Sequence, residues 1–158
     1  MNILFLCTHN SCRSILAEAI TRHLVVQQAN KSNVVVTSAG SAPRGIIHPL
    51  TLQYLAQCSV DTKNLQSKSW DDLTDFNPDL VITVCDQAAG ESCPVWFGGA
   101  VKGHWGLPDP TRSGLTTTQI ESEFNQLFEV LTKRCSALLQ LSTLDQAAVA
   151  AIALANPF

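Results

Sequence analysis

A cysteine and an arginine, separated by five residues, stand between a short apolar run and a helical pattern near the start of the chain. Asn2 to Leu6 forms the apolar run, which is typical of a buried strand and stops at Cys7. From Ser14 onward, apolar residues recur at helical spacing, and we expect Ser14 to be the N-cap residue of this helix. The sequence therefore predicts a strand, a loop that starts at Cys7, and a helix that starts just after Arg13.

The loop from Cys7 to Arg13 has the composition of an anion site at a helix N-terminus. Backbone N–H groups there can turn inward and surround a tetrahedral oxyanion. Arg13 can clamp two anion oxygens in a bidentate fork, and the same positive surroundings, with the Ser14 hydroxyl, favour Cys7 as an attacking thiolate. The alternative is a structural cysteine with Arg13 on the surface. The strand before the loop, the helix after it, and Asn10 and Ser11 within it favour the anion site.

Further apolar runs predict more strands of the same sheet. Val34 to Thr37 forms a second run, and the helix between the two runs indicates a parallel βαβ crossover. A third run, Asp79 to Val84, ends at Cys85, and a weak fourth strand is expected near Val101 to Trp105. Helical patterns follow His48-Pro49 and cover Thr116 to Leu141 and Thr143 to Ala155.

These elements predict a single-domain α/β fold, an open four-stranded parallel sheet with helices on both faces. We expect residues 1–142 to form this domain and residues 143–158 to form a C-terminal helical extension, packed on the domain or on a partner. Sites in such sheets gather at the carboxyl ends of the strands, where Cys7 and Cys85 both lie.

Charge and cysteine content exclude several classes of protein. With 10 Lys and Arg against 13 Asp and Glu, the chain offers no overall field that would recruit nucleic acid or an anionic membrane. No apolar run reaches the roughly 18–20 residues that cross a bilayer, and the N-terminus does not resemble a secretion signal. We therefore expect a cytoplasmic protein whose cysteines serve catalysis, redox exchange or metal binding rather than permanent disulfides. The six cysteines are Cys7, Cys12, Cys58, Cys85, Cys93 and Cys135.

The segment from Leu4 to Ser14, LFLCTHNSCRS, resembles the active-site signature of the low-molecular-weight protein tyrosine phosphatases and their arsenate reductase relatives. Family-like residues continue to about Leu139, at Ser38-Ala39-Gly40, His48-Pro49, Asp61 and Asp109-Pro110, whereas His9 stands where relatives often carry Gly. The resemblance implies that Cys7 is the nucleophile, Arg13 the oxyanion clamp and Asp109 the general acid. The implied oxyanion-binding loop consists of Thr8, His9, Asn10, Ser11, Cys12, Arg13 and Ser14, in which Asn10 and Ser14 organise the hydrogen bonds.

Asp109 also suits the acid role on chemical grounds. A thiolate that displaces an oxygen from arsenate or phosphate leaves a poor leaving group unless an acid protonates it. Asp109 lies in a proline-flanked segment, Trp105 to Pro110, that can hold a carboxyl group rigidly. An Asp-Pro pair by itself is usually a turn. Together with the family resemblance, we expect Asp109 to supply the proton.

Two further cysteines distinguish a reductase from a phosphatase. Cys85 ends a strand at the same sheet edge as Cys7, and Cys93 follows after seven intervening residues. Their segment resembles the redox segment of thioredoxin-coupled arsenate reductases, which implies that Cys85 attacks Cys7 and that Cys93 then attacks Cys85. The alternative is two inert thiols or half of a zinc site, but no Cys-x2-Cys or Cys/His pair stands nearby.

The expected function is the reduction of arsenate to arsenite, for arsenic detoxification, with thioredoxin or glutathione and glutaredoxin as the external thiol reductant. We expect no bound cofactor or metal and no nucleic-acid or membrane partner, with phosphate or sulfate as substrate analogues. One alternative is a low-molecular-weight protein tyrosine phosphatase that hydrolyses phosphate monoesters, although the tyrosines common after Asp109-Pro110 in phosphatases are absent. Another is a non-enzymatic sensor of oxyanions or redox state. Cys58 and Cys135 are expected to be buried packing residues, and a protective Cys7–Cys12 disulfide is a secondary expectation.

Overall fold

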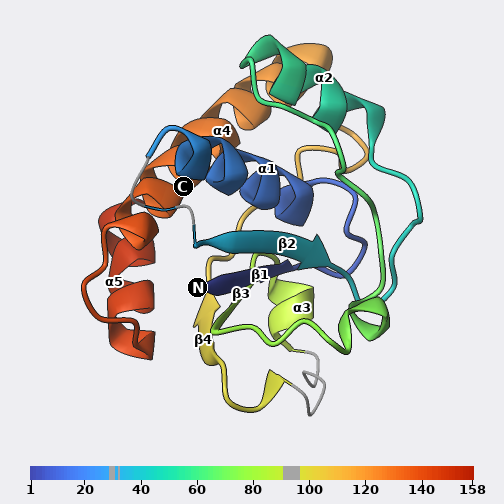
Figure 1. Cartoon of the computed structure of the whole chain (residues 1–158). Coiled ribbons are helices and arrows are strands. Elements are labelled where there is room, and N and C mark those ends of the chain that lie inside the picture. Colours follow the sequence, from blue (N-terminus) through green and yellow to red (C-terminus); the bar gives the residue numbers. More distant parts are fainter. Residues whose placement is uncertain (29–30, 32, 91–96) are drawn as a thin grey trace.

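Four parallel strands form one open sheet in the order β2-β1-β3-β4 (Figure 1). They are β1 (Asn2–Leu6), β2 (Val35–Ala39), β3 (Leu80–Thr83) and β4 (Val101–His104). The computed structural model describes residues 1–28, 31, 33–90 and 97–158. In the register of the sheet, Leu6 of β1 lies opposite both Ala39 of β2 and Thr83 of β3. The loops after these three strands therefore leave the same edge, and the predicted four-stranded parallel sheet is confirmed.

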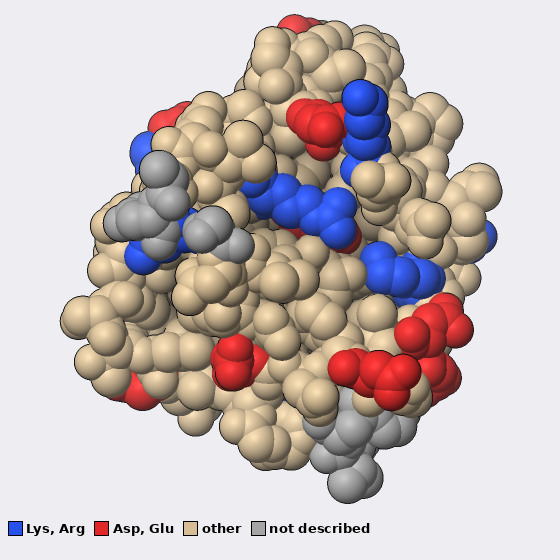
Figure 2. Space-filling view, in the orientation of Figure 1, with Lys and Arg blue, Asp and Glu red and all other residues tan. Residues whose placement is uncertain are grey.

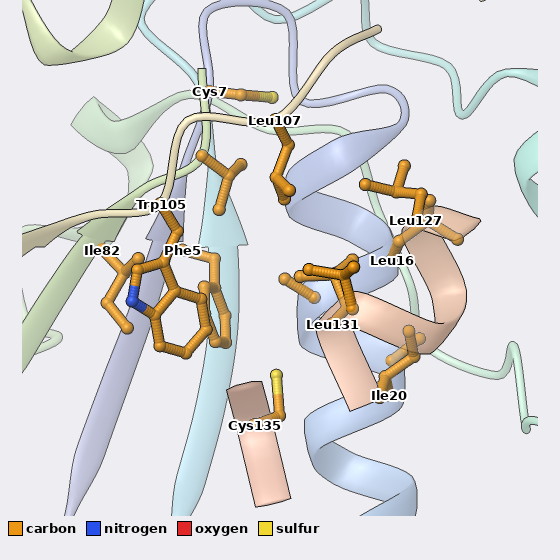
Figure 3. Close-up of a cluster of buried hydrophobic side chains, with 14 of the residues drawn as sticks. Phe5, Cys7, Leu16, Ile20, Ile82, Trp105, Leu107, Leu127, Leu131 and Cys135 are labelled. Atoms are coloured by element: carbon orange, nitrogen blue, oxygen red, sulfur yellow. The ribbon is translucent and has the colours of Figure 1, made fainter. Parts of the chain in front are cut away.

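Alternation along β1 divides the core into two layers, because successive side chains of a strand point to opposite faces of the sheet. Ile3 and Phe5 belong to one buried cluster with residues of helices α1 (Arg13–Val26), α4 (Thr117–Leu139) and α5 (Gln146–Ala155). Figure 3 shows Phe5 among the side chains that fill the space between the sheet and α1. Leu4 and Leu6 face the other side, where the short 3-10 helix η2 (Trp70–Leu73) covers them. Figure 1 shows α1 and α4 lying together over the sheet and α5 beside β4.

Two shorter helices complete the fold. Helix α2 (Pro49–Gln57) starts with a proline, which suits the first helical position, and the His48 side chain accepts a hydrogen bond from the Leu50 amide. Its Tyr54 ring stacks on Phe124 of α4 at 4.2 Å between ring centroids. Helix α3 (Asp86–Ala89) directly follows Cys85, in a region where the sequence predicted only a loop before β4. None of the helices in the described part of the chain is long and apolar enough to span a membrane.

Two sequence-based expectations about single residues are wrong. Ser14 is not the N-cap of α1, because the helix starts at Arg13 and the N-cap residue is Cys12, which makes no side-chain capping bond. Instead, the buried Ser14 hydroxyl lies beside Cys7. Cys58 is exposed at the end of α2, since its position lies beyond the last turn that packs on the core. Cys135, in contrast, is buried as expected.

Charged side chains of both signs are interspersed on the surface formed by α1 and the edge strand β2 (Figure 2). Acidic side chains gather at the lower right of this view, around η2, whose Asp71 and Asp72 are exposed. The described part of this face carries no continuous positive surface. On this face, any attraction for an anion must therefore come from local groups.

Candidate functional site

The Cys7 sulfur lies at the end of β1, nearly buried, and is held by two polar neighbours. The backbone N–H of Asn10 donates to Cys7 Sγ at 3.2 Å, and Ser14 Oγ lies 2.9 Å from the same sulfur. Because the Asn10 amide group already donates to Ser14 Oγ at 2.9 Å, the Ser14 hydroxyl hydrogen is available to the sulfur. Two donors that converge on one sulfur suit a thiolate nucleophile.

Asn10 organises the loop through a fully buried side chain and a left-handed backbone. Its φ of 44° lies in a region that Asn tolerates better than most residues. The side-chain amide donates to Ser14 and to Ser38 Oγ at 2.9 Å each, while its oxygen accepts from the Lys68 backbone N–H at 2.8 Å. One side chain thus ties the loop to α1, to β2 and to the segment before η2.

The chain of hydrogen bonds continues from Ser38 to a buried carboxylate. Ser38 donates its hydroxyl hydrogen to Glu18 of α1, and Glu18 pairs with Arg22 one turn later. Burial raises the pKa of Glu18, although the Ser38 hydrogen bond and the charges of Lys68 and Arg22 oppose this effect. Every donor in this series then has a defined direction, from Asn10 through Ser38 to Glu18, which restricts the Asn10 side chain to one orientation.

Three carbonyl groups of the loop bond to a neighbouring segment instead of lining the loop interior. The carbonyl oxygens of Thr8, His9 and Ser11 accept from the backbone N–H groups of residues 42, 44 and 48, at 2.9, 3.0 and 3.0 Å. Carbonyl oxygens repel an anion, so taking them out of the loop interior favours anion binding.

Gly40, at the end of β2, lets this segment approach the loop. A Cβ atom at this position would lie 2.5 Å from the Thr8 carbonyl oxygen and 2.9 Å from that of Cys7. Both atoms belong to the backbone and cannot move without shifting the loop itself. Glycine is therefore required here by the space available.

Gly40→Ala is expected to weaken sulfate or phosphate binding about tenfold and to lower the free energy of unfolding by about 1–3 kcal/mol, the usual cost of overpacking. Calorimetric titration with sulfate and thermal unfolding measure the two effects. Gly99→Ala is the matched control, because a Cβ there meets no atom of the described residues within 4 Å and Gly99 is not at a positive φ. Equal behaviour of the two variants would contradict the close approach at Gly40.

Arg13, the first residue of α1, faces the loop that follows β4. Its guanidinium donates to the Leu107 carbonyl oxygen at 3.0 Å and to Asp109 Oδ2 at 3.2 Å. The side chains of Arg13 and Asp109 are 16% and 31% exposed, so solvent and a small anion can reach the pair. The structure thus brings together two residues that the sequence singled out far apart in the chain, Arg13 and Asp109, at the start of the helix that follows the Cys7 loop.

Asp109 is held as a carboxylate in the free protein. Burial acts to raise its pKa, but hydrogen bonds from Thr111 and the charges of Arg13 and Arg44 outweigh burial and lower the pKa below its usual value. The Thr111 hydroxyl and backbone N–H both donate to Asp109 Oδ1, at 2.6 and 2.9 Å. Asp109 can therefore donate a proton only when an anion is bound, because the like charge of the anion raises the pKa of the carboxyl group again.

This coupling makes anion binding depend on pH in a defined direction. Because a bound anion raises the pKa of Asp109, binding is linked to proton uptake, and sulfate affinity should increase as pH falls from 6 toward the free-state pKa. Sulfate keeps its charge over this range. Asp109→Asn should bind sulfate more tightly at pH 6 and show a flatter profile. Titration calorimetry across the pH range measures both, and parallel profiles for the two proteins would exclude Asp109 as the coupled group.

Cys85 follows β3 and lies next to the Cys7 loop. Its buried sulfur is 3.8 Å from the Thr8 hydroxyl and accepts a hydrogen bond from the Ala88 backbone N–H at 3.4 Å. Cys93, the other expected redox cysteine, lies outside the described residues. The sequence-based grouping of a second thiol with the anion loop therefore has a structural counterpart at Cys85.

Cys12 lies in the loop but differs from Cys7 chemically. Burial raises the pKa of Cys12 to about 12, with only partial compensation from the Thr51 hydrogen bond. The thiol therefore stays protonated near neutral pH and does not compete as a nucleophile. Among the described residues, no group of three or more His, Cys, Asp or Glu side chains could hold a metal ion.

Sequence reasoning did not assign several residues that shape this site. Ser38 and Glu18 support Asn10, the Leu107 carbonyl orients Arg13, and Thr111 holds Asp109. For Thr111 a signal existed, because Asp followed two residues later by Thr is a common side-chain-to-backbone turn pattern. The other contacts join segments far apart in the chain and leave no local pattern.

Comparison with known proteins agrees with this geometry. Residues 2–150 match the family model described as low molecular weight phosphotyrosine protein phosphatase. Arsenate reductase 2 of Staphylococcus saprophyticus is 36% identical over 108 residues, which cover 68% of this chain and 77% of that protein. The expected relation to arsenate reductases is thus confirmed.

Solved structures show the same fold. The thioredoxin-dependent arsenate reductase of Corynebacterium glutamicum superposes with a TM-score of 0.65 at 29% identity, covering 88% of this chain and 60% of that chain. A low molecular weight phosphotyrosine phosphatase of Vibrio cholerae reaches a TM-score of 0.69 at 19% identity, covering 91% and 99%. Fold, sequence match and the Cys7 loop agree, and the chain belongs to the low molecular weight phosphotyrosine protein phosphatase family.

Proposed function

We propose that this chain is an arsenate reductase that converts arsenate to arsenite with Cys7 as its nucleophile. The observation that carries the proposal is the second buried thiol, Cys85, beside the loop that holds Cys7. Hydrolysis of a phosphate ester needs only water for its second step, whereas reduction of As(V) needs two electrons, which a pair of thiols supplies. The similarity to proteins named arsenate reductases supports the same reading.

In the first step, the loop binds arsenate and the Cys7 thiolate attacks arsenic. Arg13 clamps two oxygens of the anion, and the Cys7–arsenic bond replaces one arsenic–oxygen bond. The departing oxygen takes a proton from Asp109, whose carboxyl group the bound anion has raised in pKa, and leaves as water. The product is a thiol–arsenate adduct in which arsenic is still As(V).

In the second step, the Cys85 thiolate attacks the Cys7 sulfur. A Cys7–Cys85 disulfide forms, the sulfur–arsenic bond breaks, and its electron pair stays on arsenic, which leaves as As(III) arsenite. Cys93 then attacks Cys85, forms a Cys85–Cys93 disulfide and frees Cys7. An external thiol reductant, either thioredoxin or two glutathione molecules with glutaredoxin, supplies the two electrons that reduce that disulfide and is itself oxidised to a disulfide. Such donors operate in a reducing compartment, so we place the protein in the cytoplasm.

A coupled assay tests the function and the donor together. NADPH oxidation is followed with arsenate, once with thioredoxin and its reductase and once with glutathione, glutaredoxin and glutathione reductase. We expect arsenate-dependent oxidation with one of the two systems, at a rate that is zero without arsenate. Phosphate should compete, because the two anions are nearly isosteric.

The alternative, a low-molecular-weight phosphatase, predicts phosphate-ester hydrolysis without arsenate-dependent NADPH oxidation. If neither donor supports arsenate-dependent oxidation, while a phosphate monoester is hydrolysed at about 1 s⁻¹ or faster, within the common range of enzyme turnover, the chain is a phosphatase. Turnover of either substrate would exclude a purely sensing role.

A further inference from the structure

Arg134 of α4 is a buried arginine, only 4% exposed, and it lies outside the anion site described above. Burying a guanidinium group is costly unless its N–H groups find acceptors. Within the described part of the chain, no carboxylate pairs with it. Its Nε donates to the Asn156 carbonyl oxygen at 2.9 Å and its Nη1 to the Trp105 carbonyl oxygen at 3.3 Å. The Arg134 guanidinium group therefore donates to two main-chain oxygens, one at the end of α5 and one directly after β4.

Trp105 is the point where these contacts meet. Its backbone N–H donates to the Thr83 carbonyl oxygen at 2.8 Å, which extends the pairing of β3 and β4 by one residue. The indole N–H donates to the Val149 carbonyl oxygen of α5 at 3.2 Å, and the Arg134 guanidinium lies 5.9 Å from the ring centroid. Figure 3 shows the indole against Phe5, at 6.1 Å between ring centroids. Trp105 is thus fully enclosed by the core, α4 and α5.

Helix α5 can hold Trp105 because it packs unusually close to β4. A Cβ atom on Gly103 would lie only 2.4 Å from Val149 Cγ1, so the helix sits directly on the strand backbone. Val149 is fully buried, and the C-cap residue of α5, Asn156, supplies the second acceptor for Arg134. Arg134 therefore joins the end of α5 to the residue that starts the next loop.

That loop leads into the anion site within four residues. The Leu107 backbone N–H bonds to Val84, and the Leu107 carbonyl oxygen accepts from Arg13 at 3.0 Å. Leu107 lies next to Cys7 in Figure 3. Asp109 follows and pairs with the same guanidinium. The orientation of Arg13 thus depends on two groups whose loop is anchored at Trp105.

We propose that Arg134 is a positioning residue of the anion site, which together with α5 holds Trp105 so that the Leu107 carbonyl and Asp109 orient Arg13. Its effect on turnover rests on the proposed reductase function, whereas its effect on anion binding does not. This assigns a role to the C-terminal helix and to a buried cation that the reaction itself does not use.

Arg134→Met tests the role by removing the donors while keeping the length and apolar stem of the side chain. We expect sulfate affinity to fall about fivefold to tenfold and kcat for arsenate reduction to fall by at least as much. Arg134→Lys keeps the charge but places its donors on a single nitrogen, which cannot reproduce the Nε and Nη1 contacts together, so it should recover part of both. Lys133→Met is the matched control, because Lys133 is the exposed neighbour on the same helix and pairs only with Glu129 in the described structure.

The pH profile separates positioning from mere stability. If Arg13 turns away from Asp109, the carboxylate loses one of the charges that lower its pKa, while Arg44 and the Thr111 hydrogen bonds stay. The Asp109-dependent part of the sulfate-binding profile should therefore move to higher pH in Arg134→Met. General destabilisation of a still folded protein does not move it. Trp105→Phe, which removes the indole bond to Val149 and part of the buried ring, should shift the profile in the same direction by a smaller amount.

The outcomes are distinct. If Arg134→Met lowers the midpoint of thermal unfolding but keeps the sulfate affinity and pH profile of Lys133→Met, the positioning role is wrong. If Arg134→Met does not fold, Arg134→Lys and Trp105→Phe decide by the same two readouts. If the wild-type protein reduces no arsenate while sulfate binding still depends on Arg134, the reductase proposal fails and the positioning role stands.

Discussion

Cys85→Ser is expected to abolish multiple-turnover arsenate reduction, with a loss of at least about 100-fold, because the thiolate that attacks the Cys7 adduct is absent. The chemical reason is that a serine hydroxyl cannot form a disulfide, so the arsenic keeps its oxidation state. Hydrolysis of p-nitrophenyl phosphate, in contrast, should stay within about threefold of wild type, since Cys7, Arg13 and Asp109 are unchanged. The coupled NADPH assay and a phosphate-ester assay, run on the same preparation, measure the two activities.

Two companion variants sharpen this result. Cys93→Ser should release about one arsenite per enzyme and then stop, with a Cys7–Cys85 disulfide detectable by mass spectrometry of peptides. Cys58→Ser is the matched control, because Cys58 is exposed at the end of α2 and should leave both activities unchanged. Sustained turnover by Cys85→Ser, with a folded protein, would refute the thiol relay.

Arg13→Lys is expected to reduce kcat/KM for arsenate by about 100-fold to 1,000-fold, in line with the loss of a key stabilising donor in other enzymes. The guanidinium makes two contacts on the protein side, to Leu107 and Asp109, and in the proposed reaction its other N–H groups bind the anion. An ammonium group is a point charge with no planar fork, so it cannot keep both protein contacts and clamp two anion oxygens.

Arsenate kinetics and sulfate titration together check this prediction. Arg112→Lys is a suitable control, because Arg112 is on the same loop as Asp109 but its guanidinium pairs with Glu123 and contacts Asp109 only at the backbone carbonyl oxygen. We expect Arg112→Lys to stay within about threefold of wild type, as is usual for an exposed ion pair. If Arg13→Lys behaves like Arg112→Lys, bidentate clamping by Arg13 is not part of the reaction.

Much of the fold was predictable because the relevant signals are local. The apolar runs at residues 2–6 and 80–84 predicted strands that the structure contains, and the helical spacing after Ser14 and Thr116 predicted α1 and α4. The start of α1 was misjudged by two residues, because the N-cap is Cys12 and not Ser14, although a serine before a helical pattern usually caps it. Here the hydroxyl lies beside the Cys7 sulfur instead. Cys7 is seven residues earlier in the sequence and comes close to Ser14 only when the loop has folded.

Some residues of the site could likewise be predicted from local sequence patterns, and others could not. The spacing of Cys7 and Arg13 between a strand and a helix was enough to predict an anion loop, because such a loop is built from consecutive residues. The position of Cys85 after a strand also predicted that it lies at the same edge of the sheet as Cys7, since the carboxyl ends of parallel strands meet at one edge. Asp109 needed the family resemblance, as an Asp-Pro pair by itself indicates only a turn.

By itself, the sequence determined the parallel sheet, the Cys7 loop and the cysteines available for redox chemistry, since each depends on periodicity or on spacing within one segment. Only the tertiary structure decided that Asn10 is held through Ser38 and Glu18, and that Arg13 is oriented by Leu107 and Asp109. It likewise placed Arg134 against Trp105 and the end of α5. The physical reason is that hydrogen bonds between distant segments depend on side-chain and carbonyl directions, which are set only when the strands and helices pack.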